Sequence, residues 1–213
     1  MLISSGAVVT LPALFLQVDH TKLSWRFRVL GILPLIFFLA QGVHYWRIGQ
    51  LGHMFWMCNI GNLLLAVGLL LGRLIPIRVA ALWMIPGLVV WFLYVVMPYG
   101  VFLTSMLAHI GALIAAMIAL QRVRVDARAW MYALGWYFIV QLLSRWLTPV
   151  EFNVNLSQTV QAGWEQTFSS YWKFWVVLTL LVAAGLWALG RVFSTLWPAP
   201  YQSLVADEAV RPF

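Results

Sequence analysis

The chain has 213 residues, of which 63% are hydrophobic and only 9% are charged, and its mean hydropathy is +0.90. One soluble core of this size cannot bury so much apolar surface, so the composition excludes an ordinary soluble domain and indicates an integral membrane protein. The net charge of +7 comes from basic residues scattered singly near the ends of apolar stretches. Because they form no stripe, they do not indicate a nucleic-acid partner.

Six apolar stretches are each long enough to cross a hydrocarbon layer about 30 Å thick, given a helical rise of about 1.5 Å per residue. None alternates as a barrel strand does, and unpaired backbone is costly in lipid. The sequence therefore predicts an all-α, polytopic bundle of six transmembrane helices. The predicted spans are Leu30–Trp46, Met54–Leu71, Ala80–Met97, Val101–Leu120, Trp130–Leu147 and Tyr171–Val192.

The basic residues predict the orientation of this bundle. With a cytoplasmic N-terminus, ten Lys and Arg fall inside and three fall outside. Cytoplasmic connections carry the excess of Lys and Arg, so both termini are predicted in the cytoplasm of a multi-pass cell-membrane protein. The inner set is Lys22, Arg26, Arg28, Arg73, Arg78, Arg122, Arg124, Arg128, Arg191 and Arg211, and the outer set is Arg47, Arg145 and Lys173.

Three regions follow along the chain. Residues 1–29 are predicted as a cytoplasmic or interfacial segment, because Leu2–Val18 lacks the basic start and the small-residue cleavage site of a signal peptide. Residues 30–192 are the transmembrane domain, and residues 193–213 are a cytoplasmic tail that follows a Pro-rich helix stop.

The external loop, residues 148–170, is rich in aromatic and amide side chains and is expected to fold over the bundle as a lid. Glu151 and Glu165 are the acidic residues predicted outside. They are candidates for acid–base work or for holding a cation, and the alternative is that they pair with nearby basic residues and pin the loop.

Polar side chains within the spans are the best sequence guide to a site, because they are expensive in hydrocarbon. They gather in the predicted outer half of the membrane, which indicates an outward-facing polar pocket beneath the loop. The members are Cys58, Asn59 and Asn62, then Thr104, Ser105 and His109, then Gln141, Ser144 and Arg145.

Helical spacing links several of these residues. Cys58 and Asn62 are four apart and share a face, as do Ser105 and His109. A thiol becomes a useful nucleophile when a His accepts its proton, which makes Cys58 and His109 the candidate catalytic pair.

Supporting roles can be assigned around this pair. Asn59 and Asn62 are candidate oxyanion donors, and Ser105 or Gln141 could orient the His. The alternative is structural: amides and hydroxyls that join helices, a satisfied His and a thiol that behaves as a small hydrophobe.

The segments His53-Met54-Phe55-Trp56-Met57-Cys58-Asn59-Ile60-Gly61-Asn62 and Pro98-Tyr99-Gly100 through His109 resemble the YwaF-like integral membrane proteins, a six-helix family. The resemblance covers the middle of the chain. Relatives of that family include lipid acyltransferases and lipid hydrolases that act within the bilayer. The resemblance implies Cys58 as nucleophile, His109 as base and Asn153 or Asn155 as loop amides.

Two other classes of function stay open. A small Trp-rich bundle with small-residue faces suits a non-catalytic subunit of a larger membrane complex that holds lipid, pigment or quinone. A transporter is a lesser alternative, because no internal repeat is evident. The His spacing matches no metal motif, and a single cysteine excludes a multi-Cys cluster, so no metal or cofactor is predicted. Membrane lipids are the expected partners.

Overall fold

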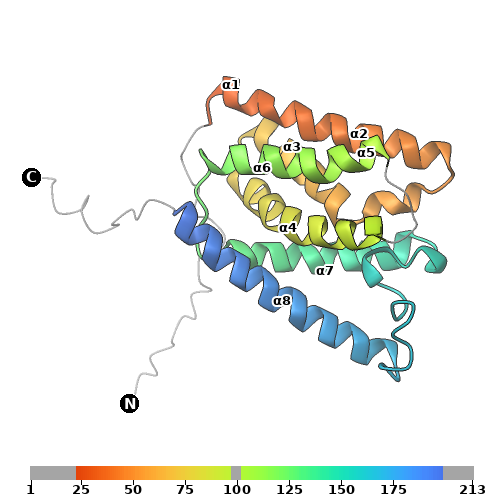
Figure 1. Cartoon of the computed structure of the whole chain (residues 1–213). Coiled ribbons are helices and arrows are strands. Elements are labelled where there is room, and N and C mark those ends of the chain that lie inside the picture. Colours follow the sequence, from red (N-terminus) through yellow and green to blue (C-terminus); the bar gives the residue numbers. More distant parts are fainter. Residues whose placement is uncertain (1–22, 97–101, 199–213) are drawn as a thin grey trace, which may run out of the picture.

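The computed structural model describes residues 23–96 and 102–198 as a bundle of helices joined by short connections (Figure 1). The predicted interfacial segment Leu2–Val18 lies outside the described residues, as do Met97 and Val101, the predicted ends of two spans.

Six helical segments follow one another along the chain, and several of them are interrupted. The first runs from Trp25 to Arg47 as α1 (Trp25–Arg28), a 3₁₀ turn (Val29–Gly31) and α2 (Ile32–Arg47). Next come α3 (Met57–Leu71) and α4 (Leu74–Val96). The fourth comprises α5 (Leu103–Met106), a π-helical turn (Leu107–Gly111) and α6 (Ala112–Leu120). The last two are α7 (Ala129–Leu147) and α8 (Tyr171–Leu196).

Each predicted span overlaps one of these segments, which confirms an all-helical fold. Among the described residues, four segments are long and apolar enough to cross a membrane, and α3 is a shorter apolar helix. The four are Trp25–Arg47, Leu74–Leu93, Leu103–Leu120 and Tyr171–Leu196. The chain is therefore a membrane-embedded helical protein.

Several predicted helix starts differ from the observed ones. Met54 was expected to begin a span, but it lies in a 3₁₀ turn (Leu51–Phe55), and the extended backbone of Trp56 separates that turn from α3. The helix α4 begins at Leu74 rather than Ala80, because left-handed Gly72 (φ 67°) ends α3 and reverses the chain at once. The basic residue Arg78 is thus inside the helix and not in a connection.

The helices α3 and α4 pack closely through glycine. A Cβ built on Gly68 would lie 2.8 Å from Cγ1 of Ile77 and 3.0 Å from its backbone nitrogen. Only a residue without a side chain permits this approach, and the buried core of Leu, Ile, Val and Ala residues extends from the contact toward α6 and α7.

Connections cluster at two ends of the bundle. At the basic end, Nε of Arg28 donates to the Leu70 carbonyl at 2.8 Å, and the Val125 amide donates to the Trp197 carbonyl at 2.7 Å. At the opposite loop end, the ring of His53 stacks on Phe152 with centroids 4.5 Å apart. Figure 1 shows the basic end on the left and the loop end on the right.

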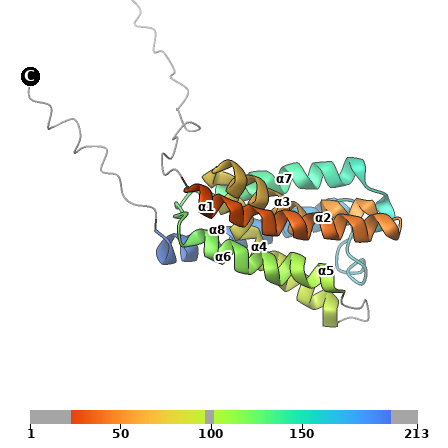
Figure 2. The same cartoon turned by 90° about the horizontal axis from the view of Figure 1, so that it is seen from above.

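The last helix is peripheral. In Figure 1, α8 crosses the bundle obliquely beside α7, and Figure 2 shows α7 and the α5–α6 segment on opposite sides of the bundle. Only a few α8 side chains are buried, such as Phe174 and Phe193, whereas Leu180 and Leu181 are exposed. This helix therefore offers most of its surface to lipid.

Candidate functional site

The loop of residues 148–170 is folded around the side chain of Asn155. Its Oδ1 accepts from the Met57 amide at 2.8 Å, and its Nδ2 donates to the Phe55 carbonyl at 2.7 Å and to Oγ of Ser144 at 2.9 Å. Nε2 of Gln141 donates to the Asn155 carbonyl at 2.6 Å. A loop residue thus caps the N-terminus of α3, whose first amides have no partner within the helix, and ties it to α7.

Arg145, which was predicted to lie outside, is also bonded to the loop. Its Nη1 donates to the Ser157 carbonyl at 2.8 Å, and its guanidinium lies 5.1 Å from the ring of Tyr171 and 5.3 Å from the ring of Trp172. The Tyr171 hydroxyl donates to the same carbonyl. Arg145 therefore joins α7 to the loop and to the start of α8.

The two glutamates do not pin the loop by ion pairs. Glu165 accepts from the Gly163 amide at 2.8 Å, and Glu151 is exposed. In the described part of the chain neither pairs with a cation. Asn153 is bonded within the loop, where its Oδ1 accepts from the amides of Gln158 and Thr159 at 3.1 and 3.0 Å. Asn153 and Asn155 are therefore structural amides in this arrangement.

The side chain of His109 is buried in the π-helical turn and is held by two contacts, whose partners Ser105 and Trp91 are bonded to each other. Its Nδ1 lies 2.8 Å from the Ser105 carbonyl, and its ring stacks on Trp91 with centroids 5.1 Å apart and planes 18° apart. Nε1 of Trp91 donates to Oγ of Ser105 at 2.8 Å. Because a carbonyl only accepts, Nδ1 carries the proton of the neutral ring, which leaves Nε2 with its lone pair.

Asn62 connects the two helices that carry the candidate pair. Its Nδ2 donates to the Cys58 carbonyl at 3.0 Å within α3 and to the Ala108 carbonyl at 2.8 Å across the interface. The expected shared face of Cys58 and Asn62 is thus observed, and the segment next to His109 lies beside it.

Both candidate residues lie against one face of α4. A Cβ built on Gly87 would be 3.3 Å from Cβ of Cys58, and Trp91, one turn further along, stacks on His109. In the described residues no hydrogen bond joins the Cys58 thiol to His109. The two side chains do not bond each other. Both lie against α4, and Asn62 joins the helix of Cys58 to the turn of His109.

The buried amides present acceptors rather than donors. Nδ2 of Asn59 donates to the His53 carbonyl at 3.0 Å, and the NH₂ group of Asn62 is likewise bonded. The oxygens Oδ1 of Asn59 and Oδ1 of Asn62 are buried and have no partner among the described residues. The predicted oxyanion donors would have to exchange these bonds before they could serve.

Sequence reasoning missed two residues of this buried polar layer. Gln41 on α2 is 1% exposed and its Oε1 also has no partner in the described structure, and Trp91 holds the His109 ring. A Gln within an apolar span is as costly as an Asn, so that signal was available for Gln41. Trp91 is one of a few aromatic residues that lie deep in the predicted spans, but sequence spacing could not predict that its ring would stack on His109.

His44 and His53 each stack on another aromatic ring. His44 stacks on Phe102 with centroids 4.1 Å apart, and His53 stacks on Phe152. Within residues 23–96 and 102–198, no group of three or more His, Cys, Asp or Glu side chains is placed to hold a metal ion.

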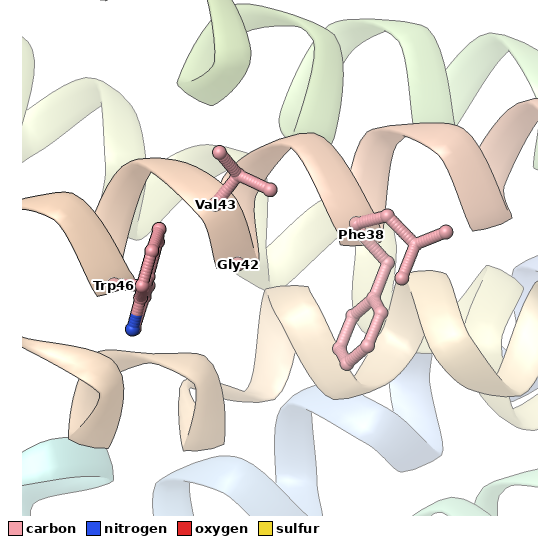
Figure 3. A pocket seen from close by; sticks show the side chains of 5 residues that line it. Phe38, Gly42, Val43 and Trp46 are labelled. Carbon is pink, nitrogen blue, oxygen red and sulfur yellow. The ribbon is translucent and has the colours of Figure 1, made fainter.

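A hollow of about 260 Å³ lies on the outer surface of α2 (Figure 3). Its lining is apolar and includes none of the buried polar residues described above. The lining residues are Phe38, Leu39, Gly42, Val43 and Trp46.

Comparisons with protein-family models, with curated proteins and with solved structures found no match to this chain. A function for the chain is therefore argued from the buried polar layer itself.

Proposed function

We propose that the chain spans the cell membrane six times with both termini in the cytoplasm. The alternation of helices between the basic end and the loop end supports this topology, since the short helix α3 and the more polar α7 each connect the two ends. The basic end carries Arg28, Arg73, Arg78, Arg122, Arg124, Arg128 and Arg191.

Cysteine accessibility tests this topology. In a Cys58→Ala background, single cysteines at Gln166 and at Arg124 are exposed to a membrane-impermeant maleimide in intact cells. We expect labelling at Gln166 in intact cells and at Arg124 only after the membrane is permeabilised. Labelling of both positions in intact cells would exclude six spans.

We infer that the buried polar layer carries out acyl chemistry on membrane lipid esters, with Cys58 as the nucleophile and His109 as the base. The observation that carries this proposal is the Asn62 amide, which bonds the carbonyls of Cys58 and Ala108 at once. It holds the nucleophile's helix beside the turn that carries the base. Gly87 and Trp91 of α4 contact Cys58 and His109, respectively, from the same face of that helix.

The proposed reaction has two steps. As the thiol attacks an ester carbonyl, the proton on sulfur passes to Nε2 of His109, a C–S bond forms, the ester C–O bond breaks and the proton returns to the leaving alcohol. A hydroxyl group or water then attacks the thioester, gives its proton to Nε2 and releases the Cys58 sulfur, which regains a proton. Attack by a lipid hydroxyl is transfer, and attack by water is hydrolysis.

The buried surroundings suit this chemistry in one respect and oppose it in another. Apolar walls exclude water, and they strengthen the electrostatic interaction that forms when the thiol and the ring meet in the reaction. The same burial disfavours a free thiolate, so the proton must leave the sulfur as attack proceeds. A neutral His109 with a free Nε2 meets that requirement.

The experiment is trapping of the thioester. The protein is reconstituted in bilayer nanodiscs with phospholipid that carries an alkyne-tagged acyl chain, and adducts are mapped by mass spectrometry. Because the chain contains one cysteine, a hydroxylamine-sensitive adduct identifies Cys58 directly. We expect loss of the adduct in Cys58→Ser and in His109→Gln, and its retention in the control His44→Gln.

Absence of an adduct in the folded wild-type protein would contradict the proposal. If other membrane proteins then co-purify in stoichiometric amount, the non-catalytic subunit becomes the better description.

A further inference from the structure

The helix that carries His109 is interrupted at that residue. The π-helical turn Leu107–Gly111 separates α5 from α6, and within it Ala108 and His109 are both buried. A π turn bonds residue i to i+5 in place of i+4, so it inserts one residue and turns the side chains about 100° relative to a regular helix. Such a turn persists only where its surroundings hold it.

One side chain from a neighbouring helix reaches this turn with a hydrogen bond. Asn62 is fully buried, and its Nδ2 donates to the Ala108 carbonyl at 2.8 Å. The bond to the Cys58 carbonyl fixes the other proton of the same NH₂ group. Because both acceptors are carbonyls, the amide orientation is determined: the NH₂ group must face them.

We propose that Asn62 is a positioning residue that holds the π turn and thereby presents His109 with Nε2 free. This inference rests on the proposed acyl chemistry for its functional meaning. The predicted effect of Asn62 on the orientation and tautomer of the His109 ring can be tested without the acyl chemistry.

Removal of the amide has a defined physical consequence. The Ala108 carbonyl would be buried without its donor from α3, and an unpaired buried carbonyl costs about 1–3 kcal/mol. Relaxation of the turn toward a regular α-helix relieves that cost. It also turns His109 away from Trp91, on which its ring now stacks.

Three variants separate the possible roles. Asn62→Leu keeps the volume and removes both hydrogen bonds. Asn62→Ser retains a donor that reaches the carbonyl four residues back in its own helix, at Cys58, but is too short to reach Ala108. Thr179→Val removes a side-chain hydroxyl that bonds Tyr137 between α8 and α7, outside the buried polar layer, and serves as the matched control.

Two readouts are measured in nanodiscs on folded protein. The tautomer of His109 is read from ¹⁵N chemical shifts of His-labelled protein, with the His109→Gln spectrum subtracted to assign the ring. The rate of Cys58 acylation is measured with the alkyne-tagged lipid. Wild type and Thr179→Val should show one tautomer, protonated at Nδ1, and equal rates.

Asn62→Leu and Asn62→Ser should both show mixed tautomers, and acylation should slow about 100-fold, as expected when a catalytic group is misplaced by about 1 Å. The serine variant keeps the test usable if the leucine variant does not fold. A folded Asn62→Ser variant with the wild-type tautomer and rate would overturn the inference. If wild type forms no thioester, the proposed function fails while the tautomer comparison still decides the role of Asn62.

Discussion

At the scale of single residues, Asn155 has the largest expected effect on the loop. Its side chain bonds the Met57 amide, the Phe55 carbonyl and Ser144, and its backbone is left-handed with φ 54°. Asn155→Ala removes all three bonds, leaves the start of α3 uncapped and places a less tolerant residue at positive φ. We expect a loss of about 2–4 kcal/mol in unfolding free energy.

Thermal unfolding in mild detergent measures this loss. The control is Gln166→Ala, which removes an exposed amide of the same loop. Equal melting temperatures for the two variants would show that the loop does not depend on Asn155.

The surroundings of His53 lead us to expect that the free energy of unfolding depends on pH. Its Nδ1 accepts from Nε1 of Trp56 at 3.0 Å, and its ring stacks on Phe152, so the folded state favours the neutral ring. Burial lowers the pKa of His53 below its usual value of 6.5. Between the pKa of His53 in the folded protein and its pKa of about 6.5 in the unfolded chain, the unfolded chain binds more protons. The contribution of His53 to stability is therefore complete above about pH 6.5 and declines as pH falls below it.

Unfolding measured from pH 7.5 to pH 5 tests this dependence. The decline should be no more than about 1 kcal/mol, because the ring is only half-buried. His53→Gln, which does not titrate, should have a smaller slope over the same range. An unchanged slope would assign the pH dependence to other groups.

At the scale of elements, the contact between α3 and α4 depends on glycine. A Cβ at Gly68 would meet the backbone and side chain of Ile77, whereas a Cβ at Gly135 on α7 would meet nothing within 4 Å. Gly68→Ala should therefore destabilise the protein by about 1–3 kcal/mol through overpacking. Gly135→Ala should be neutral or should stabilise it by up to about 1 kcal/mol through helix propensity.

Both alanine variants are compared by chemical unfolding in the same detergent. The prediction is that Gly68→Ala lowers the free energy of unfolding and that Gly135→Ala does not. A Gly68→Ala variant as stable as wild type would mean that the two helices can separate without penalty.

The helices were predictable from sequence because hydrophobic length alone marks them, and the π turn was not. The polar residue His109 marks this run in the sequence, but it does not indicate a π turn, and the hydrogen bond from Asn62 reaches Ala108 from 46 residues away. Helical spacing did predict that Ser105 and His109 would share a face. It could not predict that the Ser105 carbonyl, and not its hydroxyl, would bond the ring.

The roles of the loop amides were also beyond sequence reasoning. Asn155 bonds Phe55 and Met57, which are about 100 residues earlier in the chain. Spacing rules describe neighbours within one element and carry no information on such contacts. The catalytic assignment of Cys58 and His109 stays a prediction.

At the scale of the whole molecule, the basic end is held together by one buried cation. Nε of Arg78 donates to the Arg124 carbonyl at 2.6 Å, and its Nη1 pairs with Asp126 at 3.2 Å. Arg78→Leu leaves the carboxylate without this partner and should cost about 3 kcal/mol. Asp126→Asn keeps the shape and a polar partner, so its cost should be smaller, about 1 kcal/mol.

The two variants are compared by urea unfolding in mixed micelles. Equal effects would show that the pair contributes through charge alone and not through the position of Arg78 between two connections.

The peripheral position of α8 has a consequence for how the chain is made. This helix is the most apolar of the four long ones, and little of it is buried against the others. It can therefore leave the translocon and rest in lipid before it docks on α7. The short helix α3, with buried Asn59 and Asn62, has no such independence. We expect the ribosome to deliver it together with α4 as a single hairpin, already joined by the tight turn at Gly72.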